Sequence, residues 1–304
     1  MPSSKRSNGF LIALWALALA LPVGAAHAWA QDARVSGSVN FRLASGTFGS
    51  NQTTTIVYAP AVLRVDVSRF EFAGFFPYLS TQDAAGASTD AGWLPFQGGV
   101  LGSPSVGASM SGMMGGSGMM GSGTSQTTTT PPGSNTSVVS ASGLGDLVGS
   151  AGYRFVDNIL TGTQFLVSAR VKIPTAASSQ GLGTGRTDVG VAATLRKRYD
   201  SGWAYAELGF IVLGDPTGTD LRNAATWAVG GGKRISTRVY LLASAFGNTG
   251  VVSGYPAPAE VGAGLGVRLA DHLNVTAIPS VGLTHASPRY AVTLGLSTDL
   301  WRGR

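Results

Sequence analysis

Apolar and polar residues alternate along most of this chain, and the alternation predicts β-strands with two different faces. Between residues 33 and 301, about twelve segments of roughly ten residues follow this period of two. In the segment 164–173, the odd positions are apolar or small, and the even positions other than Leu166 are polar. The segments 188–196 and 261–269 repeat the pattern, with Gly, Thr or Arg at many positions of the second face.

A face made of Gly, Thr and Arg cannot form the core of a water-soluble β-sandwich. It lacks side-chain volume, and it would bury unpaired guanidinium groups. We therefore expect the polar face to line the inside of a closed barrel and the apolar face to contact lipid. The expected fold class is all-β: a transmembrane antiparallel β-barrel of about twelve strands, of the bacterial outer-membrane type. The alternative is a secreted β-sandwich.

Short and long connections alternate along the chain, as in outer-membrane barrels with short periplasmic turns and long external loops. The short connections lie around Ser68 and at 156–162, 200–202, 236–237 and 271–272. The others lie at 45–53, 82–143, 175–186, 214–222, 247–258 and 284–288, and only the last of these is short. Twelve strands place both termini in the periplasm. Ten or fourteen strands stay open, because Pro60 and Pro77 are unusual in central strands.

The first 30 residues resemble a secretory signal peptide. A basic start is followed by the apolar stretch 10–26, and small residues allow cleavage after Ala28 or Ala30. The alternative is a retained membrane anchor. We expect residues 1–30 to be the signal peptide and 31–301 the barrel, located in the bacterial outer membrane. Within the barrel, the Gly/Ser/Met/Thr-rich stretch 82–141 is expected to be an external low-complexity loop.

The amino-acid composition also supports a barrel wall that faces lipid. Charged residues make up only 12% of the chain, against about 25% in ordinary soluble domains. The chain has no Cys, which excludes disulfides, thiolate metal sites and cysteine nucleophiles. The net charge of +6 is not gathered in a long basic run, so we expect no nucleic-acid partner.

The charged residues of the barrel fall on the polar face. A basic lining of the lumen, the interior of the barrel, would favour anions such as aromatic carboxylates. In the alternative, acids and bases pair across strands and fill a narrow barrel. The selectivity candidates are Arg64, Arg154, Arg170, Lys172, Arg196, Arg198, Arg234, Arg268, Asp146, Asp188 and Glu207, with Asp66 and Glu71 on the same face. An interfacial aromatic girdle is expected from Phe70, Phe72, Phe76, Tyr78, Tyr153, Phe155, Tyr199, Trp203, Tyr290 and Trp301.

Two stretches resemble the outer-membrane family named for the MetA pathway of phenol degradation, whose members are called transporters. The motif positions are Ser142, Gly143, Leu144, Gly145 and Asp146 in the first stretch, and Lys172, Pro174, Thr175, Gly183, Thr184, Gly185 and Asp188 in the second. The resemblance covers roughly residues 142–301. It implies an outer-membrane β-barrel that passes aromatic or other small hydrophobic compounds.

Two further features contain groups with chemistry of their own. Five methionines, Met110, Met113, Met114, Met119 and Met120, lie in the low-complexity stretch, and thioethers suit Cu(I). A disordered external loop is the simpler interpretation. His285 and Ser287 share a strand parity, as a lipid-facing hydrolase would require, but a nucleophilic Ser also needs an orienting partner for its base.

The resulting prediction is an outer-membrane channel or transporter for passive uptake of small molecules, with aromatic or anionic compounds as the candidates. We expect no catalytic residue and no cofactor. The expected partners are outer-membrane lipid, a small-molecule permeant and the outer-membrane assembly machinery. Two alternatives are a closed structural or surface-interaction barrel without transport and the hydrolase.

Overall fold

The computed structural model describes residues 33–48, 53–84, 138–177, 182–215, 221–251 and 256–302. Its strands are β1 (Ala33–Gly46), β2 (Thr54–Val67), β3 (Phe70–Ala84), β4 (Val138–Leu144), β5 (Leu147–Asn158), β6 (Thr163–Ile173), β7 (Asp188–Tyr199), β8 (Gly202–Val212), β9 (Ala224–Arg234), β10 (Val239–Asn248), β11 (Ala259–Ala270), β12 (Leu273–Gly282) and β13 (Tyr290–Arg302). Among these residues, no helix is long and apolar enough to cross a bilayer.

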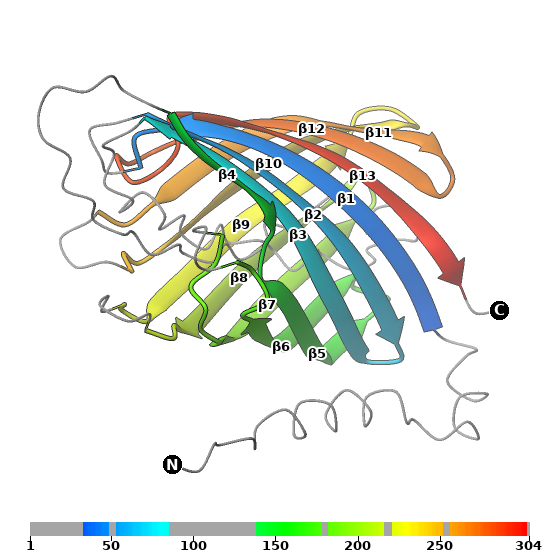
Figure 1. Cartoon of the computed structure of the whole chain (residues 1–304). Coiled ribbons are helices and arrows are strands. Elements are labelled where there is room, and N and C mark those ends of the chain that lie inside the picture. Colours follow the sequence, from blue (N-terminus) through cyan, green and yellow to red (C-terminus); the bar gives the residue numbers. More distant parts are fainter. Residues whose placement is uncertain are drawn as a thin grey trace, which may run out of the picture.

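The strands form one closed antiparallel barrel (Figure 1). β1 pairs with both β13 and β2, and β2 pairs with β3, so the sheet has no free edge there. β3 pairs with β5 through residues 70–75 and with β4 through residues 78–84. β4 and β5 therefore share one place in the ring. Thirteen strands with two in one place make a twelve-position barrel, which confirms the predicted fold class.

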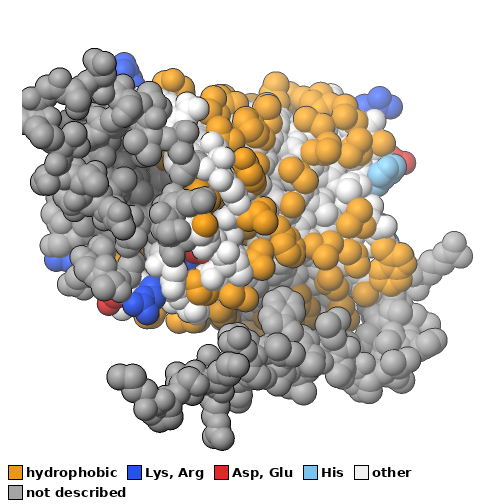
Figure 2. Space-filling view, in the orientation of Figure 1, with side chains coloured by type: hydrophobic (Ala, Val, Ile, Leu, Met, Phe, Trp, Pro, Cys, Tyr) orange, Lys and Arg blue, Asp and Glu red, His pale blue; other side chains and the backbone are white. Residues whose placement is uncertain are grey.

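The alternation of side chains along the strands is inverted relative to a soluble sheet, as predicted. Large apolar side chains such as Val191, Leu195, Leu208 and Leu294 are exposed on the outer wall. Figure 2 shows hydrophobic side chains over the middle of one outer face, while charged side chains gather toward its two ends. An apolar outer band is what a hydrocarbon environment requires of a barrel.

The short connections lie at one end of the barrel, where β1 begins and β13 ends (Figure 1). Ser68 and Gly162 adopt positive φ angles in two of these turns. The longer connections lie at the opposite end. By the outer-membrane rule, the short-turn end is periplasmic and the other end is external.

The family motif around residues 142–146 does not open one continuous strand, because the chain is divided there into β4 and β5. Between β4 and β5, the Gly145 amide donates to the Pro77 carbonyl of β3. A Cβ on residue 145 would lie 3.1 Å from the Pro77 ring, so a glycine suits this close approach. The expected external loop 82–141 is shorter than predicted at both ends, because β3 continues to Ala84 and β4 begins at Val138. The signal peptide 1–30 and Met110–Met120 lie outside the described residues.

Candidate functional site

Most of the selectivity candidates point into the barrel, as their parity predicts. Arg64, Arg154, Arg170, Lys172 and Arg196 are buried there, each at most 5% exposed. The remaining three basic candidates, Arg198, Arg234 and Arg268, are more exposed and lie toward the periplasmic ends of their strands.

The buried basic residues are paired with acids instead of lining an open basic path. Glu71 on β3 lies 3.3 Å from Arg196 on β7 and 3.8 Å from Arg64 on β2. Arg154 on β5 forms an ion pair with Asp66 on β2. These pairs connect β2, β3, β5 and β7 on the inner face of the barrel, and we call these five residues the lumen network. Its positive charge is largely compensated, so it lacks the excess that an anion path needs.

A second pair lies beside the lumen network. Arg170 on β6 donates to Glu207 on β8 over 2.7 Å, and Thr194 on β7 donates to the other oxygen of the same carboxylate over 2.9 Å. Arg42 and Glu260, neither of which was among the candidates, form an equivalent buried pair at 2.6 Å. Parity alone could have indicated both, because each lies on the polar face of its strand.

The motif residues come together in one cluster at the external end. The Lys172 ammonium lies 2.7 Å from Asp188, 3.4 Å from Asp146 and 2.8 Å from the Thr184 hydroxyl. Lys172 is completely buried. We call these four residues the Lys172 cluster. One cation held between two carboxylates and a hydroxyl is stable in a buried site only because every charge has a partner.

The Lys172 cluster anchors the connection between β6 and β7. The Ala176 amide donates to Asp146 over 3.0 Å, which turns the chain back toward β5 immediately after β6 ends. Gly183 lies so close to the same carboxylate that a Cβ there would be 2.8 Å from both of its oxygens. Gly185 has a φ of 66°, in the region that favours glycine. The motif glycines therefore let the connection fold onto Asp146.

Leu182, on this connection, is buried inside the external mouth of the barrel. It is 2% exposed and belongs to an apolar group that we call the mouth cluster, made of Ala44, Phe48, Ile56, Tyr58, Leu79, Leu182 and Ala291. The other members come from β1, β2, β3 and β13, except Phe48, which lies two residues beyond β1. A connection that starts at β6 thus reaches strands on the far side of the ring and narrows the entrance.

Two further apolar groups line the lumen. The first contains Trp203, Tyr205, Ala228, Tyr240, Leu242 and Phe246 on β8, β9 and β10, with Ile278 packed against it. The second contains Val62, Ala73, Phe75, Val148 and Ile211, with Leu213 packed against it. We call them the aromatic lumen cluster and the aliphatic lumen cluster. Trp203 and Tyr205 stack with ring centroids 6.0 Å apart.

Glycines in the wall make room for these inward rings. A Cβ on Gly230 would lie 2.7 Å from the Tyr205 hydroxyl oxygen, and one on Gly232 would lie 2.9 Å from the Trp203 indole nitrogen. The prediction that Trp203 belongs to an outer aromatic girdle is therefore wrong, because odd positions of β8 face inward. Phe70, Phe72, Phe155, Tyr199, Tyr290 and Trp301 are exposed toward strand ends, as a girdle requires, whereas Phe76 and Tyr78 are exposed in the middle of β3.

The geometry does not assemble a hydrolase at Ser287. Its hydroxyl donates to the Ala259 carbonyl over 2.8 Å, receives the Ala259 amide over 2.9 Å, and lies 3.1 Å from the Thr284 hydroxyl. His285 takes part in none of these contacts and is exposed. Ser287 therefore ties an external loop to β11 and is not aligned with a base.

The sequence matches no protein-family profile and no curated protein. Among solved structures, an outer membrane channel from Pseudomonas putida F1 is similar with a TM-score of 0.61, 11% identity, and coverage of 88% of this chain and 96% of that chain. The CymD monoaromatic hydrocarbon channel has a TM-score of 0.45, 10% identity, and coverage of 90% of this chain and 90% of that chain.

The toluene transporter TbuX of Ralstonia pickettii has a TM-score of 0.44, 9% identity, and coverage of 89% of this chain and 90% of that chain. At such identities, the likeness to the Pseudomonas channel establishes the fold alone. This chain is a transmembrane β-barrel of the outer-membrane type. The resemblance to the phenol-degradation family stays a prediction.

Proposed function

We propose that this chain is an outer-membrane channel through which small apolar molecules, aromatic ones included, move down their concentration gradient. The observation that carries the proposal is the pairing of the charges. In the lumen network, each of the three guanidinium groups contacts one of two carboxylates, while apolar clusters line the lumen at the mouth and below it. A lining of ring faces and aliphatic groups favours apolar permeants, since these lose little hydration there.

The anionic alternative has less support. An anion path needs guanidinium groups that are free to pair with a carboxylate. In the lumen network and the Arg170–Glu207 pair, the guanidinium groups already contact acids of the same chain. The mixed lining still offers a few donors, because Arg64 Nη1 and Arg196 Nη2 have no hydrogen-bond acceptor within the described residues. A slightly polar aromatic molecule could use them.

Uptake of a neutral aromatic probe tests the proposal. Radiolabelled toluene would be offered to cells of a Gram-negative host that express the full chain or an empty vector. The chain offers a matched pair of variants, Ser150→Phe and Gly149→Phe. Ser150 has the inward parity of β5 and is half-buried, whereas its neighbour Gly149 has the outward parity and nothing within 4 Å of its Cβ position.

Expression should raise the initial uptake rate, Ser150→Phe should lower it severalfold, and Gly149→Phe should leave it unchanged. Equal uptake with and without the chain would overturn the proposal. Conductance of the purified protein in a planar bilayer, with its reversal potential in a salt gradient, gives an independent measurement. Large conductance steps with strong anion preference would support the anionic alternative instead.

A closed barrel without transport is the second candidate, and one observation favours it. The lumen network and the Lys172 cluster bury large charged side chains inside the barrel, with Arg196 1% exposed and Lys172 fully buried. Such a barrel would give no conductance and no uptake, yet it would fold and show heat-modifiable gel mobility. The two candidates are therefore separated by the same experiment.

Location and biogenesis belong to the same proposal. The inverted barrel and the alternation of short turns and longer loops support the bacterial outer membrane. Export through a cleaved signal peptide and insertion by the outer-membrane assembly machinery would follow. Mass spectrometry of the purified chain tests the cleavage: a mature protein beginning after Ala28 or Ala30 is the expected result.

A further inference from the structure

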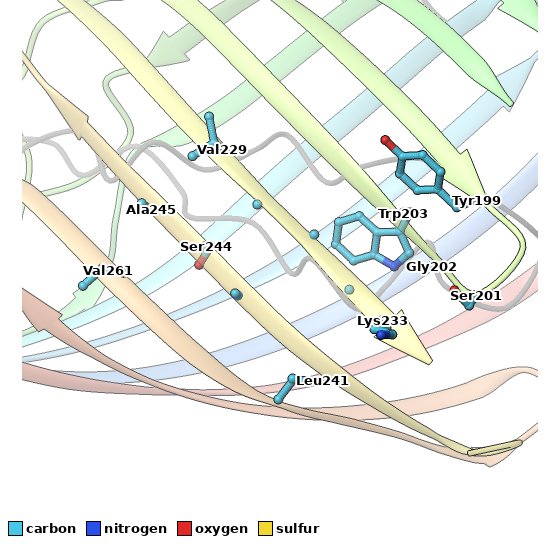
Figure 3. A pocket seen from close by; sticks show the side chains of 14 residues that line it. Tyr199, Ser201, Gly202, Trp203, Val229, Lys233, Leu241, Ser244, Ala245 and Val261 are labelled. Carbon is cyan, nitrogen blue, oxygen red and sulfur yellow. The ribbon is translucent and has the colours of Figure 1, made fainter. Parts of the chain in front are cut away.

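The outer wall of the barrel carries an apolar groove near its periplasmic end. The groove has a volume of about 600 Å³, within the range of about 300–1,000 Å³ that drug-sized ligands occupy. Its walls come from the outward positions of β9, β10 and β11 and from the turn between β7 and β8 (Figure 3). The lining includes Val229, Gly231, Leu241, Ala243, Ala245 and Val261.

The groove exists because small residues face each other across neighbouring strands. Gly231 on β9 is in register with Ala204 on β8 and with Ala243 on β10. Bulkier residues lie on the rows above and below, where Val229 pairs with Ala245 and Lys233 pairs with Leu241. The depression is therefore set by side-chain size in one row, and a larger side chain at position 243 would fill it.

Its periplasmic rim is basic. Lys233 lines the groove beside Tyr199 and Ser201, close to the turn that contains Gly202 (Figure 3). Within the part of the chain that the structure describes, the Lys233 ammonium has no hydrogen-bonding or ionic partner. Lys197, another outward basic residue at this end, differs in that its ammonium donates to Thr161 and Thr163. Lys233 is thus a cation at the membrane interface that is available to an anion.

We propose that this groove binds one anionic phospholipid of the periplasmic leaflet, with an acyl chain over Gly231 and Ala243 and the phosphate at Lys233. An apolar groove that ends at an unpartnered ammonium and an aromatic ring at the interface is complementary to an acyl chain joined to a phosphate. The inference uses the membrane orientation but does not depend on transport.

Lipid retention tests the site with the full chain. The protein would be purified in a mild non-ionic detergent, mixed with phosphatidylglycerol or phosphatidylcholine, and analysed by native mass spectrometry. We expect one phosphatidylglycerol to be retained in preference to phosphatidylcholine. Lys233→Gln should weaken that retention about fivefold, the contribution of one basic residue at an anionic surface. Lys197→Gln is the matched control and should leave retention unchanged.

A second variant tests the groove itself. Ala243→Phe should abolish the preferential retention, while Ala169→Phe, an exposed outward position on β6, should not. Equal retention by the wild type and Lys233→Gln would overturn the proposal, and so would unchanged retention by Ala243→Phe. If the wild type is dimeric by light scattering and Ala243→Phe is monomeric, the groove instead binds a second copy of the chain. None of these readouts changes if the barrel proves to be closed.

Discussion

At the scale of single residues, the candidate site depends on how buried charges are shared. In the Lys172 cluster, two carboxylates share one ammonium. In the lumen network, Glu71 lies between two guanidinium groups. In each arrangement, one central residue neutralises two oppositely charged partners. Substituting the central residue therefore removes the counter-charge of both partners at once.

Lys172→Met is expected to destabilise the barrel by about 3–5 kcal/mol, because it leaves Asp146 and Asp188 buried without their shared cation. The loss would be measured from the urea midpoint of unfolding in detergent micelles. Arg302→Gln is the matched control. Arg302 is 53% exposed in its side chain, so its pair with Asp299 contributes only about 0–1 kcal/mol. Equal losses for the two variants would contradict a special role for the Lys172 cluster.

Gly183→Ala is expected to loosen the connection between β6 and β7. The new Cβ would lie 2.8 Å from both Asp146 carboxylate oxygens and from the Ala176 Cβ, and overpacking of this kind costs about 1–3 kcal/mol. Gly149→Ala provides the comparison, since nothing lies within 4 Å of that position. The temperature at which the heat-modifiable gel band shifts should fall for the first variant and stay constant for the second.

At the scale of elements, the connections decide what the strands enclose. β6 ends at Ile173, and the chain folds back so that Leu182 enters the mouth cluster. β4 and β5 are separated at Gly145 and Asp146, and Asp146 is then free to hold this connection. A break in one strand and an inward connection therefore belong to the same local structure.

Leu182→Ala should widen the external entrance, because it removes most of a side chain that is 2% exposed within the mouth cluster. We expect a larger single-channel conductance in planar bilayers, or faster aromatic uptake where conductance stays below detection. Leu144→Ala removes the same atoms from a position that is 72% exposed and should change neither quantity. If both variants behave like the wild type, Leu182 does not limit entry.

The positions of the strands could be predicted from the sequence, whereas breaks within strands and the side chains that fill the lumen were harder to predict. Period-two alternation identifies β7 and β11 directly, because lipid outside and polar groups inside impose opposite demands on neighbouring residues. The break between β4 and β5 was missed, because the contact of Gly145 with Pro77 joins residues that are distant in sequence. From the sequence alone, Gly145 cannot be distinguished from a glycine inside a continuous strand. The inward position of Trp203 was missed because aromatic residues near strand ends usually form a girdle.

At the scale of the whole molecule, the charges are arranged so that the lumen carries little net field. Parity predicted which basic residues face inward, but it could not predict their partners. Arg196 and Glu71 are far apart in sequence and meet only because the curved wall brings the inner faces of β7 and β3, three places apart in the ring, within reach of each other. The spacing of residues along one strand does not predict which residues of other strands they contact. Closure of the barrel therefore converts a basic sequence into a nearly compensated interior.

Removing one acid should leave the lumen network with more uncompensated positive charge. Glu71→Gln leaves Arg64 and Arg196, at 3.8 and 3.3 Å from the former carboxylate, without their shared counter-charge. Because fixed charge in a pore sets its ion selectivity, the reversal potential in a salt gradient should move toward that of chloride. Glu71→Asp keeps the charge and should stay close to the wild type. A reversal potential that is the same in all three proteins would mean that permeating ions do not pass the lumen network.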